Sequence, residues 1–159
     1  MYPIRPWLYV GNFRETLDYN LLNRTNISAM LQLAESVQHP GIASLYIAIE
    51  DGESLSYENL RRGVEFVRSE NARGKNVLIA CGAGISRGVS FAIACIKEEE
   101  NLSLLDAFRQ IQAQHSQAMP HLELWQSLCD YYNEDVPYKN ILKLILQQIA
   151  IAKRLPLIP

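Results

Sequence analysis

The stretch that most constrains the fold lies in the middle of the chain, at residues 76–90, with the sequence NVLIACGAGISRGVS. It begins with four consecutive apolar residues, 77–80, which are typical of a strand buried on both faces of a sheet. Gly82 and Gly84 then permit a tight turn, because residues without a Cβ let backbone N–H groups approach a ligand closely. Residues 89–96 are apolar nearly all round, which suits a buried helix. The stretch therefore predicts a strand, a loop and a helix in direct succession.

Cys81 stands where the predicted strand ends and the loop begins. The N–H groups of the loop and the positive end of the following helix would surround a point just above it, which suits a tetrahedral oxyanion. A helix N-terminus beside a cation also stabilises a thiolate at neutral pH. Arg87 closes the loop, and its planar guanidinium can hold two oxygens of one phosphate group. A cysteine followed by five residues and an arginine in this setting predicts a phosphate-binding nucleophile site.

Residues 81–87, CGAGISR, resemble the signature loop of the cysteine-dependent protein phosphatases and are most similar to the dual-specificity branch. Residues 7–12 resemble the opening strand of that branch. Residues 103–108 and 120–128 resemble its two closing helices. The resemblance covers about residues 3–134.

The resemblance implies a role for each residue of the site. Cys81 would be the nucleophile, Arg87 would bind the phosphate, and Asp51, thirty residues before the cysteine, would be the general acid. The remaining residues of the substrate-binding loop would be Gly82, Ala83, Gly84, Ile85 and Ser86. For the Ser86 hydroxyl two roles stay open, a hydrogen bond to the loop or phosphate and a cap on the helix.

The implied substrate is a phosphorylated protein or another phosphomonoester. Phosphotyrosine is the first candidate, with phosphoserine and phosphothreonine as further ones, hydrolysed through a cysteinyl-phosphate intermediate. Neither a cofactor nor a metal ion is expected. The five loop residues between Cys81 and Arg87 are uncharged, which favours a single phosphate over a ligand with several.

Three positions depart from the family pattern. Ala80 stands where the family has a histidine that orders the loop and helps to keep the thiol acidic. Gly88 stands where a serine or threonine assists the departure of the thiolate, and Ser127 stands where the final helix often carries glutamine. These differences weaken turnover more than phosphate binding. A module that binds phosphorylated partners with little turnover therefore stays open as the alternative.

The composition is that of one ordinary globular chain of 159 residues, 48% hydrophobic and 20% charged. A net charge of −2 without basic runs speaks against nucleic acid or an anionic membrane as a partner. No segment approaches the ~18 uncharged apolar residues of a membrane span, and the N-terminus lacks the apolar core of a signal peptide. We therefore expect a cytoplasmic protein.

The other cysteines and the histidines receive no catalytic role from their spacing. Cys95 and Cys129 lie in apolar helical patterns and are predicted to be inert core residues, since free buried cysteine behaves as a small hydrophobe. His39, His115 and His121 show neither catalytic nor metal-binding spacing and are expected in loops or at the surface.

The whole chain predicts an α/β fold, with a central, mostly parallel sheet of four or five strands flanked by helices. Strands are expected at residues 7–10, 27–33, 45–49 and 77–80. Helices are expected at residues 14–22, 56–74, from 88, from 103 and from 120. If the strands that precede Asp51 and Cys81 are parallel neighbours, both residues lie at the same edge of the sheet.

Residues 136–159 lie beyond the resemblance and are expected to form a helical extension of a catalytic domain at residues 1–135. Seven isoleucine and leucine residues between positions 141 and 151 give this helix more apolar surface than one stripe needs. Those expected on one side are Ile141, Leu144, Ile145 and Ile149. We expect the helix to pack on its own domain or on a second copy, and favour a homodimer.

Overall fold

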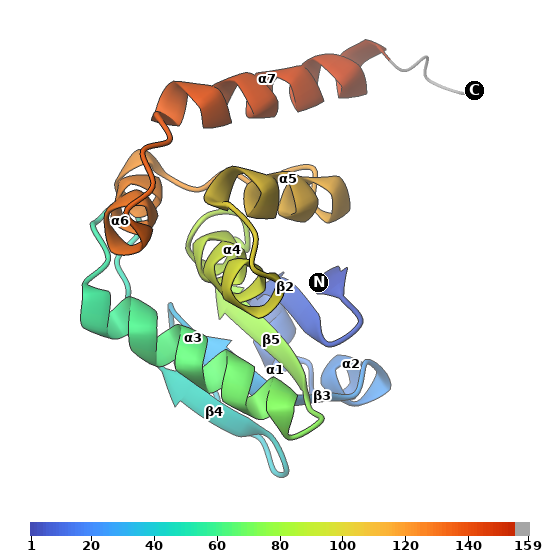
Figure 1. Ribbon diagram of the computed structural model, residues 1–159. Helices are drawn as coiled ribbons and strands as arrows, with labels where there is room; N and C mark the ends of the chain where they lie inside the picture. Colours follow the sequence, from blue (N-terminus) through green and yellow to red (C-terminus); the bar gives the residue numbers. More distant parts are fainter. Residues whose placement is uncertain (155–159) are drawn as a thin grey trace.

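The computed structural model describes residues 1–154, so residues 155–159 of the predicted extension lie outside the described part. One mixed sheet forms the centre of the fold, with the strand order β1-β2-β5-β3-β4 (Figure 1). The strands are β1 (Tyr2–Arg5), β2 (Leu8–Asn12), β3 (Ile27–Gln32), β4 (Ala43–Tyr46) and β5 (Asn76–Cys81). β1 is antiparallel to β2, and all other neighbours are parallel. The predicted α/β fold is confirmed.

Helices cover both faces of this sheet. They are α1 (Phe13–Leu17), α2 (Tyr19–Arg24), α3 (Tyr57–Ala72), α4 (Arg87–Glu100), α5 (Leu104–Gln114), α6 (Leu122–Tyr132) and α7 (Tyr138–Arg154). α1 and α2 pack on one face, and α3 and α4 pack on the other. α5 and α6 pack against α4, and α7 lies outside them (Figure 1). Every residue of α4 from Gly88 to Ile96 is buried, which confirms the predicted central helix.

Several predicted boundaries were wrong. β1 was not expected, and the helix predicted at residues 14–22 is two helices, because the Asp18 side chain accepts the N–H of Leu21 and starts a second one. The strand predicted at residues 45–49 begins at Ala43 and ends at Tyr46. The helix expected to begin at Pro120 begins two residues later.

α7 lies against the rest of the fold along one side. Ile141 and Ile145 are buried in the core, and the Gln112 side chain of α5 donates to the carbonyl of Leu144 at 3.0 Å. The Tyr138 hydroxyl donates to the carbonyl of Pro120 at 2.8 Å. Other apolar side chains of α7 are 41–62% exposed: Leu142, Leu146, Ile149 and Ile151.

The exposure of Ile149 differs from the prediction that it would lie with Ile141. The buried isoleucines of α7, Ile141 and Ile145, both lie in its first half, whereas Ile149 in its second half is 44% exposed. No helix within residues 1–154 is long and apolar enough to cross a membrane.

Candidate active site

The nucleophile loop, residues 82–86, connects the end of β5 to the start of α4. Cys81 is only 2% exposed at the base of this loop. Its Sγ accepts two backbone hydrogen bonds, from the N–H of Gly84 at 3.3 Å and from the N–H of Gly88 at 3.4 Å. Both donors stabilise negative charge on the sulfur, and Gly88 lies in the first turn of α4, where the helix dipole adds to the effect.

Gly84 gives the loop its shape. Its φ is +75°, and a Cβ built there would lie 2.9 Å from both the carbonyl carbon and oxygen of Gly11 in β2. Only glycine adopts this conformation freely and fits so close to another backbone. The carbonyl of Gly84 accepts a hydrogen bond from His115 Nε2 at 2.8 Å. The loop is therefore held between β2 and the end of α5.

Arg87 lies half-buried at the other end of the loop. Its Nη1 donates to the carbonyl of Ile49 at 2.8 Å. A Cβ built on Gly82 would lie 2.9 Å from Nη2, so the guanidinium lies directly beside the start of the loop. This places the cation of Arg87 between the nucleophile loop and the segment that leads to Asp51.

The acid loop, residues 50–55, carries Asp51 and rests on α6. Asp51 Oδ1 lies 3.3 Å from His121 Nε2, with both side chains about half exposed. The Ser54 hydroxyl donates to the Glu123 carboxylate at 3.3 Å. Together with a hydrogen bond from the N–H of Leu55 to Ser127, these contacts to α6 and its N-cap hold the acid loop in place.

Ser127 makes the third contact. Its hydroxyl accepts the N–H of Leu55 at 2.9 Å and donates to the carbonyl of Glu123 at 2.8 Å. Ser127 thus fixes the end of the acid loop, a role that its place in the sequence pattern of α6 did not reveal.

The residues just before α6 also bind the nucleophile loop. The N–H of His121 donates to the Ser86 hydroxyl at 3.0 Å, and the N–H of Met119 donates to the carbonyl of Ile85 at 2.8 Å. The Ser86 side chain makes no capping bond to α4, although Ser86 occupies the N-cap position. His121 therefore joins the two loops, through its backbone to one and through its side chain to the other.

His115 lies in the loop that follows α5, one of the two predicted locations, but it is not at the surface. Its side chain is fully buried at the end of α5, and its ring stacks on that of Tyr2 with centroids 3.6 Å apart and planes 9° from parallel. Because a carbonyl only accepts, Nε2 carries the hydrogen that binds Gly84. Burial lowers the pKa of His115, which keeps the ring neutral. Local sequence pattern could not reveal this contact, because the partner lies 31 positions away.

Cys95 and Cys129 are buried, as predicted. Burial is the main cause that raises the pKa of both thiols. Cys81, with two N–H donors on its sulfur, is therefore the cysteine best placed to act as a thiolate.

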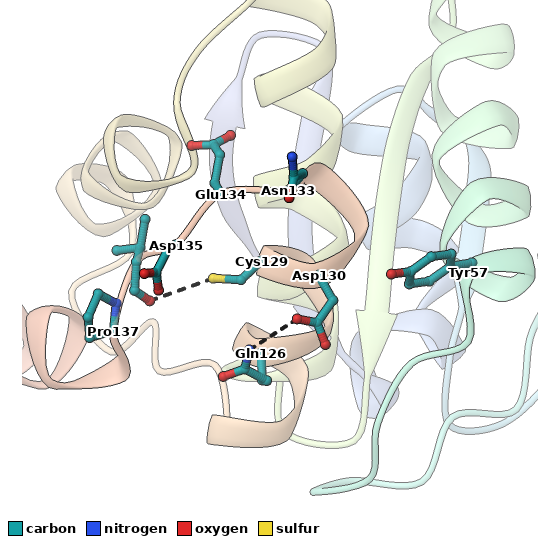
Figure 2. A pocket seen from close by; sticks show the side chains of 9 residues that line it. Tyr57, Gln126, Cys129, Asp130, Asn133, Glu134, Asp135 and Pro137 are labelled. Carbon is teal, nitrogen blue, oxygen red and sulfur yellow. Dashed lines mark hydrogen bonds between the residues drawn. The ribbon is translucent and has the colours of Figure 1, made fainter.

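A separate hollow of about 450 Å³ lies between the start of α3 and the end of α6 (Figure 2). Tyr57 lies on one side of it, and Asp130, Glu134 and Asp135 on the other. The Cys129 thiol points from α6 towards the carbonyl of Val136, at 3.6 Å. None of the residues that line the hollow belongs to the nucleophile loop or the acid loop.

Comparison with known proteins agrees with this geometry. The family model described as "Dual specificity phosphatase, catalytic domain" matches residues 8–134. The human protein named "Dual specificity protein phosphatase 22" is 29% identical over 148 residues, which are 90% of this chain and 80% of that protein. The mouse protein of the same name is 27% identical over 139 residues, 86% of this chain and 76% of that protein.

Solved structures show the same fold. The crystal structure of human DUSP28 superposes with a TM-score of 0.78 at 21% identity, covering 84% of this chain and 96% of that one. The crystal structure of DUSP15 superposes with a TM-score of 0.74 at 25% identity and covers 94% of this chain and 95% of that one.

The buried neutral ring of His115 gives a testable pH dependence. Its folded-state pKa lies below the ordinary value, so the unfolded chain takes up a proton more readily as the pH falls below about 6.5. The contribution of His115 to stability is therefore complete above that pH and is lost on acidification. We expect His115→Gln to lose less stability than the wild type between about pH 7 and about pH 5, measured by urea unfolding. Equal losses in the two proteins would contradict this.

Proposed function

The chain belongs to the dual-specificity family of cysteine-dependent protein phosphatases, and from that premise we propose that it hydrolyses phosphorylated side chains through a cysteinyl-phosphate intermediate. The main observation behind the proposal is that the Cys81 sulfur accepts hydrogen bonds from two backbone N–H groups, those of Gly84 and Gly88. The Arg87 guanidinium lies beside the same loop.

The first step transfers the phosphoryl group to the enzyme. The Cys81 thiolate attacks phosphorus, a sulfur–phosphorus bond forms and the bond from phosphorus to the ester oxygen breaks. Arg87 and the free N–H groups of the nucleophile loop stabilise the charge on the equatorial oxygens. Asp51 protonates the departing oxygen, so a neutral alcohol or phenol leaves.

The second step releases phosphate. Asp51, now a carboxylate, takes a proton from a water molecule that attacks phosphorus, and the Cys81 thiolate leaves. The N–H groups of Gly84 and Gly88 receive the returning charge on the sulfur. Residues Gly82, Ala83, Gly84, Ile85 and Ser86 bind the phosphate through both steps.

The substrate class follows from the charge of the nucleophile loop. No residue between Cys81 and Arg87 is charged, so the loop suits the single phosphate of a monoester rather than a ligand with several phosphates. We propose phosphotyrosine in a protein as the first substrate to test, with phosphoserine and phosphothreonine next.

A binding module without turnover, the alternative that the sequence left open, is not favoured. The thiol, the guanidinium and the carboxylate all remain, and the family model and the relatives are those of phosphatases. We also propose a cytoplasmic location, as expected from the sequence.

Removing the nucleophile tests the proposed function. We expect the wild type to release phosphate from a phosphotyrosine peptide in EDTA, and Cys81→Ser to lose this activity by at least about a thousandfold, because a serine hydroxyl is a far weaker nucleophile at neutral pH. Cys129→Ser is the matched control and should retain activity. When phosphate release is measured with both substrate types, Asp51→Asn should slow the hydrolysis of alkyl phosphates more than that of aryl phosphates, because aryl leaving groups need less protonation. Metal-dependent activity that survives in Cys81→Ser would overturn the proposal.

Gly88→Ser tests the missing hydroxyl. A Cβ at position 88 would lie 3.5 Å from Cys81 Sγ and 3.4 Å from its other two neighbours, which are ordinary contacts, so a Cβ fits at this position. The hydroxyl would help the thiolate to leave in the second step. We expect a burst of product from the wild type with an activated aryl phosphate, and faster steady turnover in Gly88→Ser. Gly88→Ala, which adds the Cβ without the hydroxyl, should not accelerate turnover. Linear product formation from the first turnover would contradict slow hydrolysis of the intermediate.

We also propose that residues 1–135 form the catalytic domain and that the remainder is an extension through which two copies associate. The exposed side chains of Leu142, Leu146 and Ile149 lie on successive turns of α7 and would be shielded from water in a dimer. Leu146→Glu should then shift the protein to monomer in sedimentation velocity, with phosphatase activity retained. A wild type that sediments as a monomer at high concentration would contradict the proposal.

A further inference from the structure

Ala80 occupies the position at which related phosphatases have a histidine before the cysteine. The Ala80 side chain is buried in a small cluster on the sheet face that α2 covers. The members of that cluster are Leu22, Ile27, Met30, Leu78 and Ala80. This position therefore contributes packing and no hydrogen-bond donor from its side chain.

His115 contributes such a donor from elsewhere in the chain. Its Nε2–H binds the carbonyl of Gly84 at 2.8 Å, and the N–H of Gly84 in turn binds the sulfur of Cys81 at 3.3 Å. Tyr2, on the edge strand β1, stacks on the other side of the ring and donates its hydroxyl to Gln117. A continuous set of contacts thus runs from β1 through His115 to the nucleophile.

We propose that His115 supplies the loop-ordering imidazole that position 80 lacks, and that it is a positioning residue for the Cys81 thiolate. The inference rests on the proposed function, since it assumes that Cys81 is the nucleophile. His115 acts only through Gly84 and contacts neither the sulfur nor the phosphate.

Gly84 is the residue where an outside anchor has most effect. Glycine at positive φ has more conformational freedom than any other residue, so its own backbone preference does not fix the loop. The neighbouring Gly82 and Ala83 are exposed and give it little support. A single hydrogen bond to the Gly84 carbonyl therefore restricts the peptide whose other end carries the donor to Cys81.

The polarity of His115 also argues against a role in core packing alone. Its Nδ1 is buried without a hydrogen-bond partner among residues 1–154. An apolar side chain of similar size would fill the space without that cost, because an unpaired buried polar atom is unfavourable. The gain that offsets this cost is the bond to Gly84.

The experiment measures the reactivity of Cys81 itself. Inactivation by iodoacetate is followed against pH, with the labelled cysteine identified by mass spectrometry, in the wild type, His115→Leu, His115→Asn and His115→Gln. The control is His39→Leu, because His39 also binds a backbone carbonyl, that of Thr16, and stacks on a tyrosine, Tyr19.

We expect His115→Leu and His115→Asn to slow alkylation of Cys81 roughly tenfold at neutral pH, the scale of one buried hydrogen bond. The pH midpoint of alkylation should move upward, since the thiolate loses an aligned N–H donor. His115→Gln should recover most of the rate, because its amide N–H can reach the Gly84 carbonyl. His39→Leu should match the wild type.

An alkylation profile unchanged in both His115→Leu and His115→Asn, even with a lower thermal midpoint, would overturn the inference and leave His115 a core residue only. If only one of these variants folds, that variant decides the outcome together with His115→Gln. Alkylation requires no hydrolysis of substrate. Failure of this inference is thus distinguishable from failure of the proposed function, which would appear as activity retained by Cys81→Ser.

Discussion

The active site depends on the close passage of Gly84 over the end of β2. A Cβ at this residue would lie 2.9 Å from the Gly11 backbone, so any side chain would force the nucleophile loop away from the sheet. That movement would break two bonds together, the N–H of Gly84 to Cys81 Sγ and the His115 ring to the Gly84 carbonyl. A third bond, from the N–H of Phe13 to the carbonyl of Gly82, ties the loop to the start of α1. The geometry around the sulfur is thus a consequence of how closely two backbones approach.

The start of α6 is the second constraint, because it holds two loops that are distant in sequence. His121 contacts Ser86 through its backbone and Asp51 through its side chain, and Ser127 holds the N–H of Leu55. The serine at position 127 therefore has a structural explanation. Its short hydroxyl bonds to the backbone on both sides, to the acid loop and to its own helix, and so fixes where that loop ends. Displacement of α6 would move Asp51 and disturb residues 82–86 at the same time.

The sequence predicted best those parts whose cause is local. The apolar run of β5, the glycines of the loop and the all-round apolar pattern of α4 each determine their own structure, and all three were predicted. β1 escaped prediction because Tyr2–Arg5 is a short edge strand with a proline, and only its pairing with β2 defines it. The break at Asp18 arises from one side-chain cap inside an otherwise helical pattern.

The contacts of the site that escaped prediction are tertiary ones. His115 and Ser127 each bind a backbone group far away in the chain, so neither spacing nor periodicity could identify them. The carbonyl of Gly84 and the N–H of Leu55 become visible as partners only once the loops are folded. Sequence pattern predicted the groups proposed to carry the chemistry, whereas the fold revealed the contacts that hold them in place.

Ala80 and Gly88, which stand where the family has a histidine and a hydroxyl residue, differ in whether another part of the chain can replace the missing group. A loop-ordering histidine needs only to donate to a loop carbonyl, and any element that passes nearby can supply that donor, as His115 at the end of α5 does. The hydroxyl lost at Gly88 must lie beside Cys81 Sγ, where the structure offers the N–H groups of Gly84 and Gly88. These backbone donors stabilise the thiolate equally before attack and after departure, so they lower the energy of the free enzyme along with that of the departing sulfur. Only an interaction that is stronger in the transition state accelerates a step. In the proposed mechanism, residues 82–86 therefore favour formation of the Cys81 thiolate. They give less help to the second step, in which the thiolate leaves phosphorus.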